Sequence, residues 1–389
     1  MRITAIHEKT GSLETTMRNA FIDFSQMTVS LVAVVTDVVR DGKPVIGYGF
    51  NANGRYAQGG ILRERFIPRI MKADPASLVD EVNDNLDPFK IFACMMTNEK
   101  PGGHGDRAIA AAALDMAVWD AVAKIAEKPL WKLLSERFNA DQADDSVLVY
   151  PGGGYYYPEG GFDKLKAEMK SYLDDGYTVV KMKIGGADLA TDLKRIEAVI
   201  DVVGDGSLLA VDANGKFDME TAVAYAKGMT PYNLFWYEEA GDPLDYALQA
   251  ELANHYDGAF ATGENLFSHQ DIRNLLRYGG LDREKDWIMP DPALAMGVTE
   301  GLKIIDAAVA EGWPRRRIVL HGGTQLALSM TAGLQLGGTE TYPLMFQPYG
   351  GFDDACVVDK GYVKLPDHPG LGIEAKAKLY AVMKEVAEG

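Results

Sequence analysis

The sequence has 389 residues, of which 47% are hydrophobic and 24% are charged, so its composition is that of a globular protein with a sizeable core and not of a disordered chain. The 39 basic and 56 acidic side chains give a net charge of −17, which argues against nucleic acid and anionic membranes as partners. The two cysteines, Cys94 and Cys356, are too few for a disulfide framework or a cysteine-based zinc cluster.

The start of the sequence, MRITAIHEKTGSL, lacks the long apolar stretch of a signal peptide. No run of about 18 apolar residues occurs, so a transmembrane helix is not expected. We therefore expect a soluble, cytoplasmic protein.

Residues 1–140 are expected to form one α+β unit. The segments 1–8 and 28–38 are rich in β-branched residues and predict strands. The segment 47–60 is dense in glycine and asparagine and predicts a loop or turn. A strong helical run follows, and it is expected to break at Pro129.

From about residue 145, short apolar runs alternate with polar helical stretches, which predicts a parallel sheet. The predicted strands are 147–152, 178–184, 208–214, 234–240, 259–265, 287–293, 317–323 and a shorter one at 342–346. Ionisable residues end six of them: Lys183, Asp212, Glu238, Glu264, Asp291 and His321. Their spacings of 29, 26, 26, 27 and 30 residues match the units of a (β/α)8 barrel, which places its active site at the carboxyl ends of its strands.

Three of these residues, Asp212, Glu238 and Glu264, follow consecutive strands. Because neighbouring strands lie ~4.8 Å apart, the three carboxylates would crowd together and repel unless a cation holds them. Three oxygen ligands suit a hard ion, with Mg²⁺ favoured and Mn²⁺ possible. A salt-bridged structural cluster is the alternative. Glu239 adjoins Glu238, and the pattern does not decide which of the two points inward.

Lys181 and Lys183 lie two positions apart, so they share one face of a strand. Repulsion between the two charges would lower the pKa of one lysine and let it act as a base near neutral pH. The alternative is a pair of surface lysines on a sheet edge, but a closed barrel has no edge.

His321 and Asp291 end adjacent predicted strands. A carboxylate beside an imidazole holds its tautomer and stabilises its charged form, which predicts a second acid/base group. The alternative is a structural histidine before two glycines.

The ordered motifs KMK, VDAN, WYEEA, TGEN, PDPALAMGVTE and LHGG resemble those of the enolase superfamily, in its mandelate racemase-like branch. The segment 112–134 resembles the helix between the two domains of that family, and 361–374 resembles its closing segment. The resemblance implies an α/β fold with a modified (β/α)7β TIM-like barrel at 141–354. An α+β capping domain would cover it, formed by 1–140 and completed by about 355–389.

The resemblance also implies one Mg²⁺ per subunit, held by Asp212, Glu238 and Glu264. Lys183 would be one acid/base group, with Lys181 as the modulator of its pKa. The pair formed by His321 and Asp291 would be the other. Ala240 stands where the family has proline, a departure that removes no functional group.

The segments 17–28 and 49–70 resemble the capping loops of a family member that dehydrates tartrate. The implied substrate contacts are Asn214 and Glu340 from the barrel and Asn19, Arg55, Tyr56 and Lys100 from the cap.

The implied activity is Mg-dependent dehydration of an acid sugar or hydroxy diacid, tartrate to oxaloacetate above all. Lys183 would abstract the α proton to give a metal-stabilised enediolate, and His321 would assist loss of the 3-hydroxyl. Another acid-sugar dehydratase and a racemase or epimerase on the same scaffold remain open. More distant alternatives are a Schiff-base aldolase and a non-catalytic sugar-acid-binding protein. The expected partners are a small hydroxy acid and other copies of this chain, with no nucleic acid or membrane.

Overall fold

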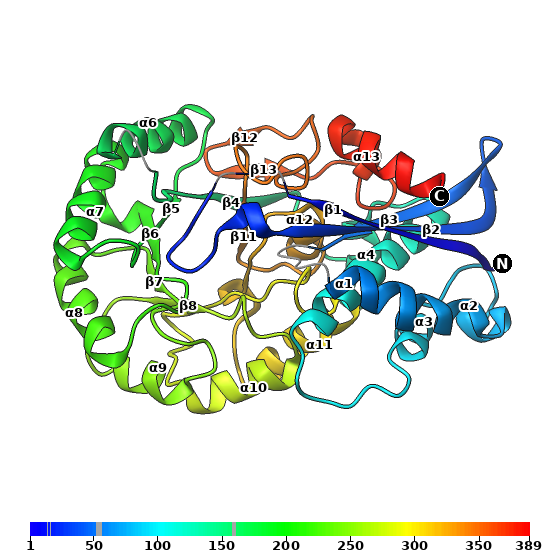
Figure 1. The fold of residues 1–389 in the computed structure, drawn as a ribbon, viewed down its shortest axis with the longest axis horizontal. Coiled ribbons are helices and arrows are strands. Elements are labelled where there is room, and N and C mark those ends of the chain that lie inside the picture. The colour runs from blue at the N-terminus through cyan, green and yellow to red at the C-terminus, as the bar shows by residue number, and fades with distance from the viewer. Residues whose placement is uncertain (14, 16, 52–56, 158–160) are drawn as a thin grey trace.

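A computed structural model gives the fold and describes residues 1–13, 15, 17–51, 57–157 and 161–389. An antiparallel sheet of three strands lies beside a barrel of parallel strands, and the helices of the barrel run along its outer side (Figure 1). None of the described helices is both long enough and apolar enough to cross a bilayer.

The antiparallel sheet has the order β1-β2-β3, with β1 at Ile3–Ser12, β2 at Thr28–Arg40 and β3 at Lys43–Phe50. Its central strand is the most apolar, and the first seven residues of β2 are all buried. The sheet packs on α4 (Asp106–Ile125), in which nearly every residue is buried. This explains why α4 is apolar on all sides and not along one stripe.

The prediction of a loop or turn over 47–60 is wrong in its first part, because Gly47–Phe50 belong to β3. The glycines serve close packing here and not a turn. A Cβ atom on Gly49 would lie 2.1 Å from the carbonyl oxygen of Ala113 in α4, and one on Gly47 would lie 2.0 Å from that of Ala117. A side chain at either position would therefore hold the strand away from the helix.

Shorter helices complete this region: α1 (Ala57–Ile61), α2 (Ile67–Lys72), α3 (Pro88–Met95) and α5 (Leu130–Phe138). A π-helical turn at Leu62–Phe66 joins α1 to α2. The helical run breaks where proline predicts it, since α4 ends at Ile125 and Pro129 caps the start of α5.

The barrel strands are β4 (Ser146–Gly153), β5 (Val180–Lys183), β6 (Leu209–Asp212), β7 (Trp236–Glu238), β8 (Phe260–Thr262), β9 (Trp287–Ile288), β10 (Val319–Leu320) and β11 (Gly338–Thr341). All eight are parallel in the order β10-β11-β4-β5-β6-β7-β8-β9, and a bridge between Ile288 and Ile318 connects the two ends. The helices between them are α6 (Gly161–Asp174), α7 (Leu189–Val203), α8 (Met219–Met229), α9 (Tyr246–Leu252), α10 (His269–Tyr278), α11 (Gly297–Ala310) and α12 (Gln325–Gly333).

The last barrel strand lies at Gly338–Thr341 and not at the predicted 342–346. The apolar residues after it pack on the capping region instead of pairing in the sheet. The ring of Phe346 lies 5.1 Å from that of Phe24 and 5.0 Å from that of Tyr342. Aromatic packing thus accounts for the apolar run that indicated a strand.

The C-terminal segment returns across both parts of the molecule. A hairpin of β12 (Val358–Asp359) and β13 (Tyr362–Lys364) pairs with β4, and α13 (Ala377–Ala387) packs on β2. The buried Asp120 of α4 joins these parts, because it accepts hydrogen bonds from the backbone nitrogens of Tyr48 and Leu371 at 2.8 and 2.7 Å.

Candidate active site

Parallel register brings the predicted site residues to one end of the barrel. Lys183 pairs with Asp212 across β5 and β6, and Asp212 pairs with Glu238 across β6 and β7. Glu264 follows β8 by two residues. Side chains that end consecutive strands in register lie beside one another, as the spacing of the sequence predicts.

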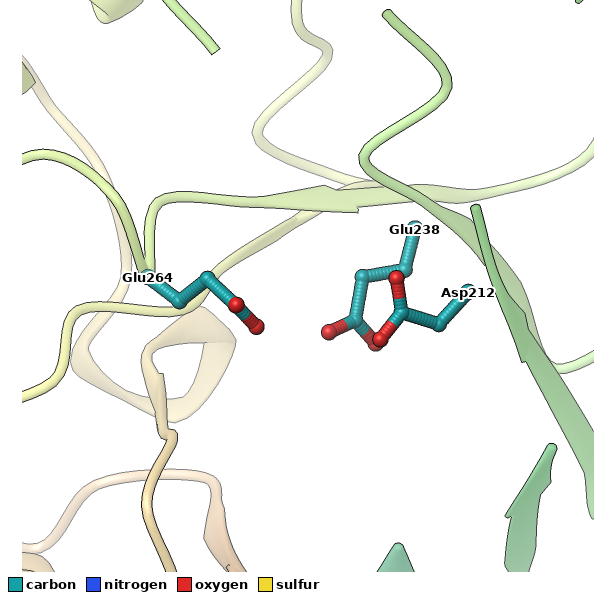
Figure 2. Close-up of side chains that lie close together, drawn as sticks. All are labelled: Asp212, Glu238 and Glu264. Atoms are coloured by element: carbon teal, nitrogen blue, oxygen red, sulfur yellow. The ribbon is translucent and has the colours of Figure 1, made fainter. Parts of the chain in front are cut away.

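One ligand atom from each of Asp212, Glu238 and Glu264 lies within 4.8 Å of the others. Figure 2 shows the carboxylates of Asp212 and Glu238 side by side, with that of Glu264 pointing towards them from the opposite side. All three residues are buried. Three buried carboxylates without a sulfur or imidazole ligand fit a hard divalent cation such as Mg²⁺.

Glu238, and not Glu239, belongs to this cluster of carboxylates. Its oxygens accept hydrogen bonds from Trp236 Nε1 and Lys181 Nζ, each at 2.8 Å. Glu239 instead accepts two hydrogen bonds of 3.0 Å from Asn265 Nδ2. Glu238 ends β7, and Glu239 follows it with a left-handed φ of 40°, so the two side chains reach different partners and the structure decides the question that the sequence left open.

The two lysines of the KMK motif are buried in the barrel and pair with carboxylates. Lys183 Nζ forms an ion pair with Asp212 Oδ2. Lys181 Nζ lies 2.8 Å from Glu238 Oε1 and 2.9 Å from Glu340 Oε1. Burial acts to lower the pKa of Lys183, but the charge of Asp212 outweighs it and the pKa is raised. The pKa of Lys181 is raised in the same way by Glu238 and Glu340.

We predicted that repulsion between Lys181 and Lys183 lowers the pKa of one of them. In the protein without a bound cation, the pKa of each lysine is raised instead. Lys181 does act to lower the pKa of Lys183, but Asp212 has the larger effect. A base at this position needs the negative charge of the carboxylates to be shared with a cation. The two lysines are not surface residues, since Lys181 is 0% and Lys183 is 3% exposed.

His321 is held in one orientation by Asp291, whose Oδ2 lies 2.8 Å from Nδ1. The other ring nitrogen, Nε2, lies 3.1 Å from Glu264 Oε2 and 3.2 Å from Glu340 Oε2. Burial acts to lower the pKa of His321, but Glu264, Glu340 and Asp291 raise it to about 10. These carboxylates therefore favour the charged imidazole, which can donate a proton.

A cavity of about 340 Å³ lies between the capping region and the mouth of the barrel. Lys183, Glu264 and His321 line it from the barrel. Its opposite wall comes from the connection between β1 and β2, which reaches over the barrel in Figure 1, and from the end of β3. The side chains of this wall are largely apolar, and they include Leu13, Phe21, Ile22, Phe24, Val29 and Phe50.

The predicted substrate contacts divide into four cases. Asn19 and Asn214 line the cavity. Glu340 is buried between Lys181 and His321, beneath the cavity wall. Lys100 is exposed and is not among the described residues that line the cavity. Arg55 and Tyr56 lie outside the described residues.

Sequence reasoning missed two tyrosines of the cavity wall, Tyr155 and Tyr342. The ring of Tyr155 lies 5.5 Å from Lys183 Nζ, and Tyr342 Oη lies 3.5 Å from His321 Nε2. Each tyrosine follows a barrel strand, β4 or β11. Tyr155 lies just beyond the first predicted strand, so the strand-end rule could have found it. Tyr342 opens the run that was predicted as the last strand, so the same rule does not find it.

The barrel of parallel strands thus has at its mouth three carboxylates suited to a metal ion, and a lysine and a paired histidine line the same cavity. Residues 164–379 match the family model described as enolase C-terminal domain-like, and residues 10–135 match that of the mandelate racemase/muconate lactonizing enzyme N-terminal domain. The chain belongs to the enolase superfamily, in its mandelate racemase and muconate lactonizing enzyme branch.

The chain is similar to the L-talarate/galactarate dehydratase of Salmonella typhimurium, with 29% identity over 349 residues that cover 89% of this chain and 81% of the relative. It is similar in structure to a racemase from Streptomyces coelicolor A3(2) with bound magnesium, with a TM-score of 0.77, 26% identity and 98% of each chain covered. It is also similar to the L-talarate dehydratase from Polaromonas sp. JS666 complexed with Mg and L-glucarate, with a TM-score of 0.76, 27% identity and 94% and 92% of the two chains covered.

Proposed function

We propose that this protein is a Mg²⁺-dependent dehydratase of an acid sugar or hydroxy diacid. The observation that carries the proposal is that Lys183 and His321 line one cavity together with Glu264 of the carboxylate triad. Two relatives with the same fold act on talarate, as their names state, and one of them was crystallised with Mg and L-glucarate.

Lys183 is the proposed base that removes the proton α to the substrate carboxylate. Its ammonium group pairs with Asp212, so the cation-binding residues and the base share one charge network. Mg²⁺, when held by the triad, supplies positive charge that stabilises the charge left on the substrate carboxylate as the α proton leaves.

His321 is the proposed acid that donates a proton to the departing 3-hydroxyl. Asp291 holds Nδ1, which leaves Nε2 as the nitrogen directed at Glu264 and Glu340. Burial acts to lower the pKa of the ring, but the surrounding carboxylates raise it, which favours the charged form that donates a proton. Loss of water gives an enol that tautomerises to a 2-keto acid.

The substrate that we propose is D-tartrate, which would give oxaloacetate and water. The support is the resemblance of the segments 17–28 and 49–70 to the capping loops of D-tartrate dehydratase. Asn19 of the first segment lines the cavity, and Asn214 faces the same space from the barrel.

A substrate panel tests the proposal. The protein is incubated with Mg²⁺ and the tartrate isomers, talarate, galactarate, glucarate, arabinonate, gluconate and rhamnonate, and 2-keto acids are assayed. We expect a 2-keto acid from D-tartrate above all, with loss of turnover in EDTA and recovery on Mg²⁺. A 2-keto acid from another member of the panel would retain the dehydratase and correct the substrate.

A racemase on the same scaffold is the second candidate, favoured by the structural similarity to the Streptomyces racemase. The two activities differ in their products, because a racemase inverts a stereocentre and releases no water. Polarimetric change without formation of a 2-keto acid would establish the racemase and overturn the dehydratase.

A further inference from the structure

A buried ion pair on α7 lies directly behind the strand that carries Lys183. Asp192 is 0% and Arg195 is 8% exposed, and Arg195 Nη1 lies 3.1 Å from Asp192 Oδ1. Neither residue is among the described residues that line the cavity. Any effect on the reaction must therefore pass through the backbone that the pair contacts.

Arg195 donates hydrogen bonds to backbone carbonyls of two neighbouring strand ends. Nη1 donates to the carbonyl of Lys183 at 2.9 Å, while Nη2 donates to those of Gly154 and Tyr155 at 2.6 and 3.2 Å. One rigid guanidinium group thus joins the end of β5 to the residues that follow β4. The planar fork of arginine suits this task, whereas the single nitrogen of lysine reaches fewer acceptors.

Asp192 holds the same region from its other side. It accepts hydrogen bonds from the backbone nitrogen of Gly185 at 2.7 Å, from Tyr156 Oη at 2.6 Å and from Tyr225 Oη at 2.9 Å. The guanidinium of Arg195 also lies 3.9 Å from the centre of the Tyr156 ring. The pair therefore contacts the backbone at Lys183 and at Gly185, and it also contacts the segment 154–156 that follows β4.

The residues held in this way carry two side chains of the cavity. The ring of Tyr155 lies 5.5 Å from Lys183 Nζ, and both residues line the cavity wall. Fixing the carbonyl groups of Lys183 and Tyr155 fixes the direction in which the two side chains leave the backbone. A buried ion pair adds little stability compared with apolar packing, so stability alone does not explain its presence here.

We propose that Asp192 and Arg195 are positioning residues, which hold the carboxyl ends of β4 and β5 together and so place Lys183 and Tyr155 against the substrate. The kinetic part of this inference rests on the function proposed above for Lys183. Misplacing a reacting group by about 1 Å can cost 10²-fold in rate.

The experiment compares Arg195→Met, Arg195→Lys and Asp192→Asn with the control Arg316→Met. Arg316 also pairs with an aspartate, Asp144, and donates a hydrogen bond to a backbone carbonyl, that of Leu336. Asp144 precedes β4 and Leu336 precedes β11, so these contacts lie at the end of the barrel opposite to the cavity. For each protein we measure kcat and KM in saturating Mg²⁺, Mg²⁺ affinity by calorimetry and the unfolding midpoint. The Lys183 signal is followed by NMR of [ε-¹³C]lysine protein and assigned by its loss in Lys183→Met.

We expect both Arg195 variants to lower kcat about 100-fold, with Mg²⁺ affinity within twofold of wild type and with a displaced Lys183 signal. Arg195→Lys keeps the charge and is the variant that decides the matter if Arg195→Met does not fold. Arg316→Met should lower the unfolding midpoint without changing kcat or the Lys183 signal.

Wild-type kcat and an unmoved Lys183 signal in folded Arg195→Lys would overturn the inference, as would an equal loss of kcat in Arg316→Met. If the wild-type protein dehydrates no acid sugar, the proposed function fails, and the NMR comparison still tests the positioning role alone.

Discussion

Asp291 Oδ2 lies 2.8 Å from His321 Nδ1, so the opposite nitrogen of the ring is the one available to the substrate. The carboxylate is itself held, because Asp291 Oδ1 accepts a 2.7 Å hydrogen bond from the backbone nitrogen of Ala293. The pair thus sets the direction of the imidazole, while Glu264 and Glu340 contribute most to keeping it charged.

The variant Asp291→Asn should lower kcat by about 10²–10⁴-fold with little change in Mg²⁺ affinity, because the imidazole loses its partner and its preferred tautomer. Asp286→Asn is the control: Asp286 is equally buried, but it precedes β9, whereas Asp291 follows that strand. Asp286 accepts hydrogen bonds from the backbone nitrogens of Phe260 and Asp282, away from the cavity. Steady-state kinetics and calorimetry check both. Equal activity of the two variants would show that Asp291 does not act through His321.

The metal site gives a second prediction. Glu264→Gln should weaken Mg²⁺ binding at least about tenfold by calorimetry, because it removes one of three charged ligands. Glu300→Gln serves as the control: Glu300 is buried too, but it pairs with His269 on α10 and Lys303 on α11. Unchanged affinity in Glu264→Gln would place the ion elsewhere.

Stability should depend on pH through Asp115 of α4. Burial raises its pKa to about 7, although its hydrogen bonds with Thr299 act to lower it. Between pH 4 and 7 the folded protein keeps a proton that the unfolded chain releases, so stability is lost as the pH rises through this range, by at most about 4 kcal/mol, and levels off above it.

Thermal unfolding of wild type and Asp115→Asn between pH 5 and pH 8 checks this. The wild-type midpoint should fall more steeply than that of the variant. A residual slope is expected in the variant, because burial also raises the pKa of Asp120 to about 6. Parallel curves would contradict the assignment to Asp115.

The contact between β3 and α4 predicts that Gly49→Ala destabilises the protein by about 2–3 kcal/mol, because the added Cβ would lie 2.1 Å from the carbonyl oxygen of Ala113. Gly11→Ala in β1 is the matched control, since a Cβ there meets nothing within 4 Å. Denaturant unfolding measures both. An equal effect of the two substitutions would show that the close approach costs nothing.

The triad could be predicted from the sequence because strand register is a local rule. Asp212, Glu238 and Glu264 each end a short apolar run, and parallel pairing brings such ends together whatever the intervening helices contain. The same reasoning placed His321 beside Asp291.

The remaining features depend on contacts between distant segments, which a local pattern does not contain. Gly47 and Gly49 indicated a turn because glycine is common in turns. The local sequence does not show that they touch a helix more than sixty residues further along the chain. The apolar run at 342–346 indicated a strand, but its Phe346 packs on Phe24 and on Tyr342. The pKa of Lys183 is raised and not lowered as expected from Lys181 alone, because the charge of Asp212 has the larger effect.

Hydrogen exchange at the α carbon tests the proposed division of labour between Lys183 and His321 most directly. The substrate identified by the panel is incubated in D₂O with Mg²⁺ and each variant, and deuterium uptake into the unreacted substrate is followed by NMR. We expect His321→Asn to exchange the α proton without forming a 2-keto acid, and Lys183→Met to do neither. Exchange by Lys183→Met, or its absence in a folded, Mg²⁺-binding His321→Asn, would contradict the account.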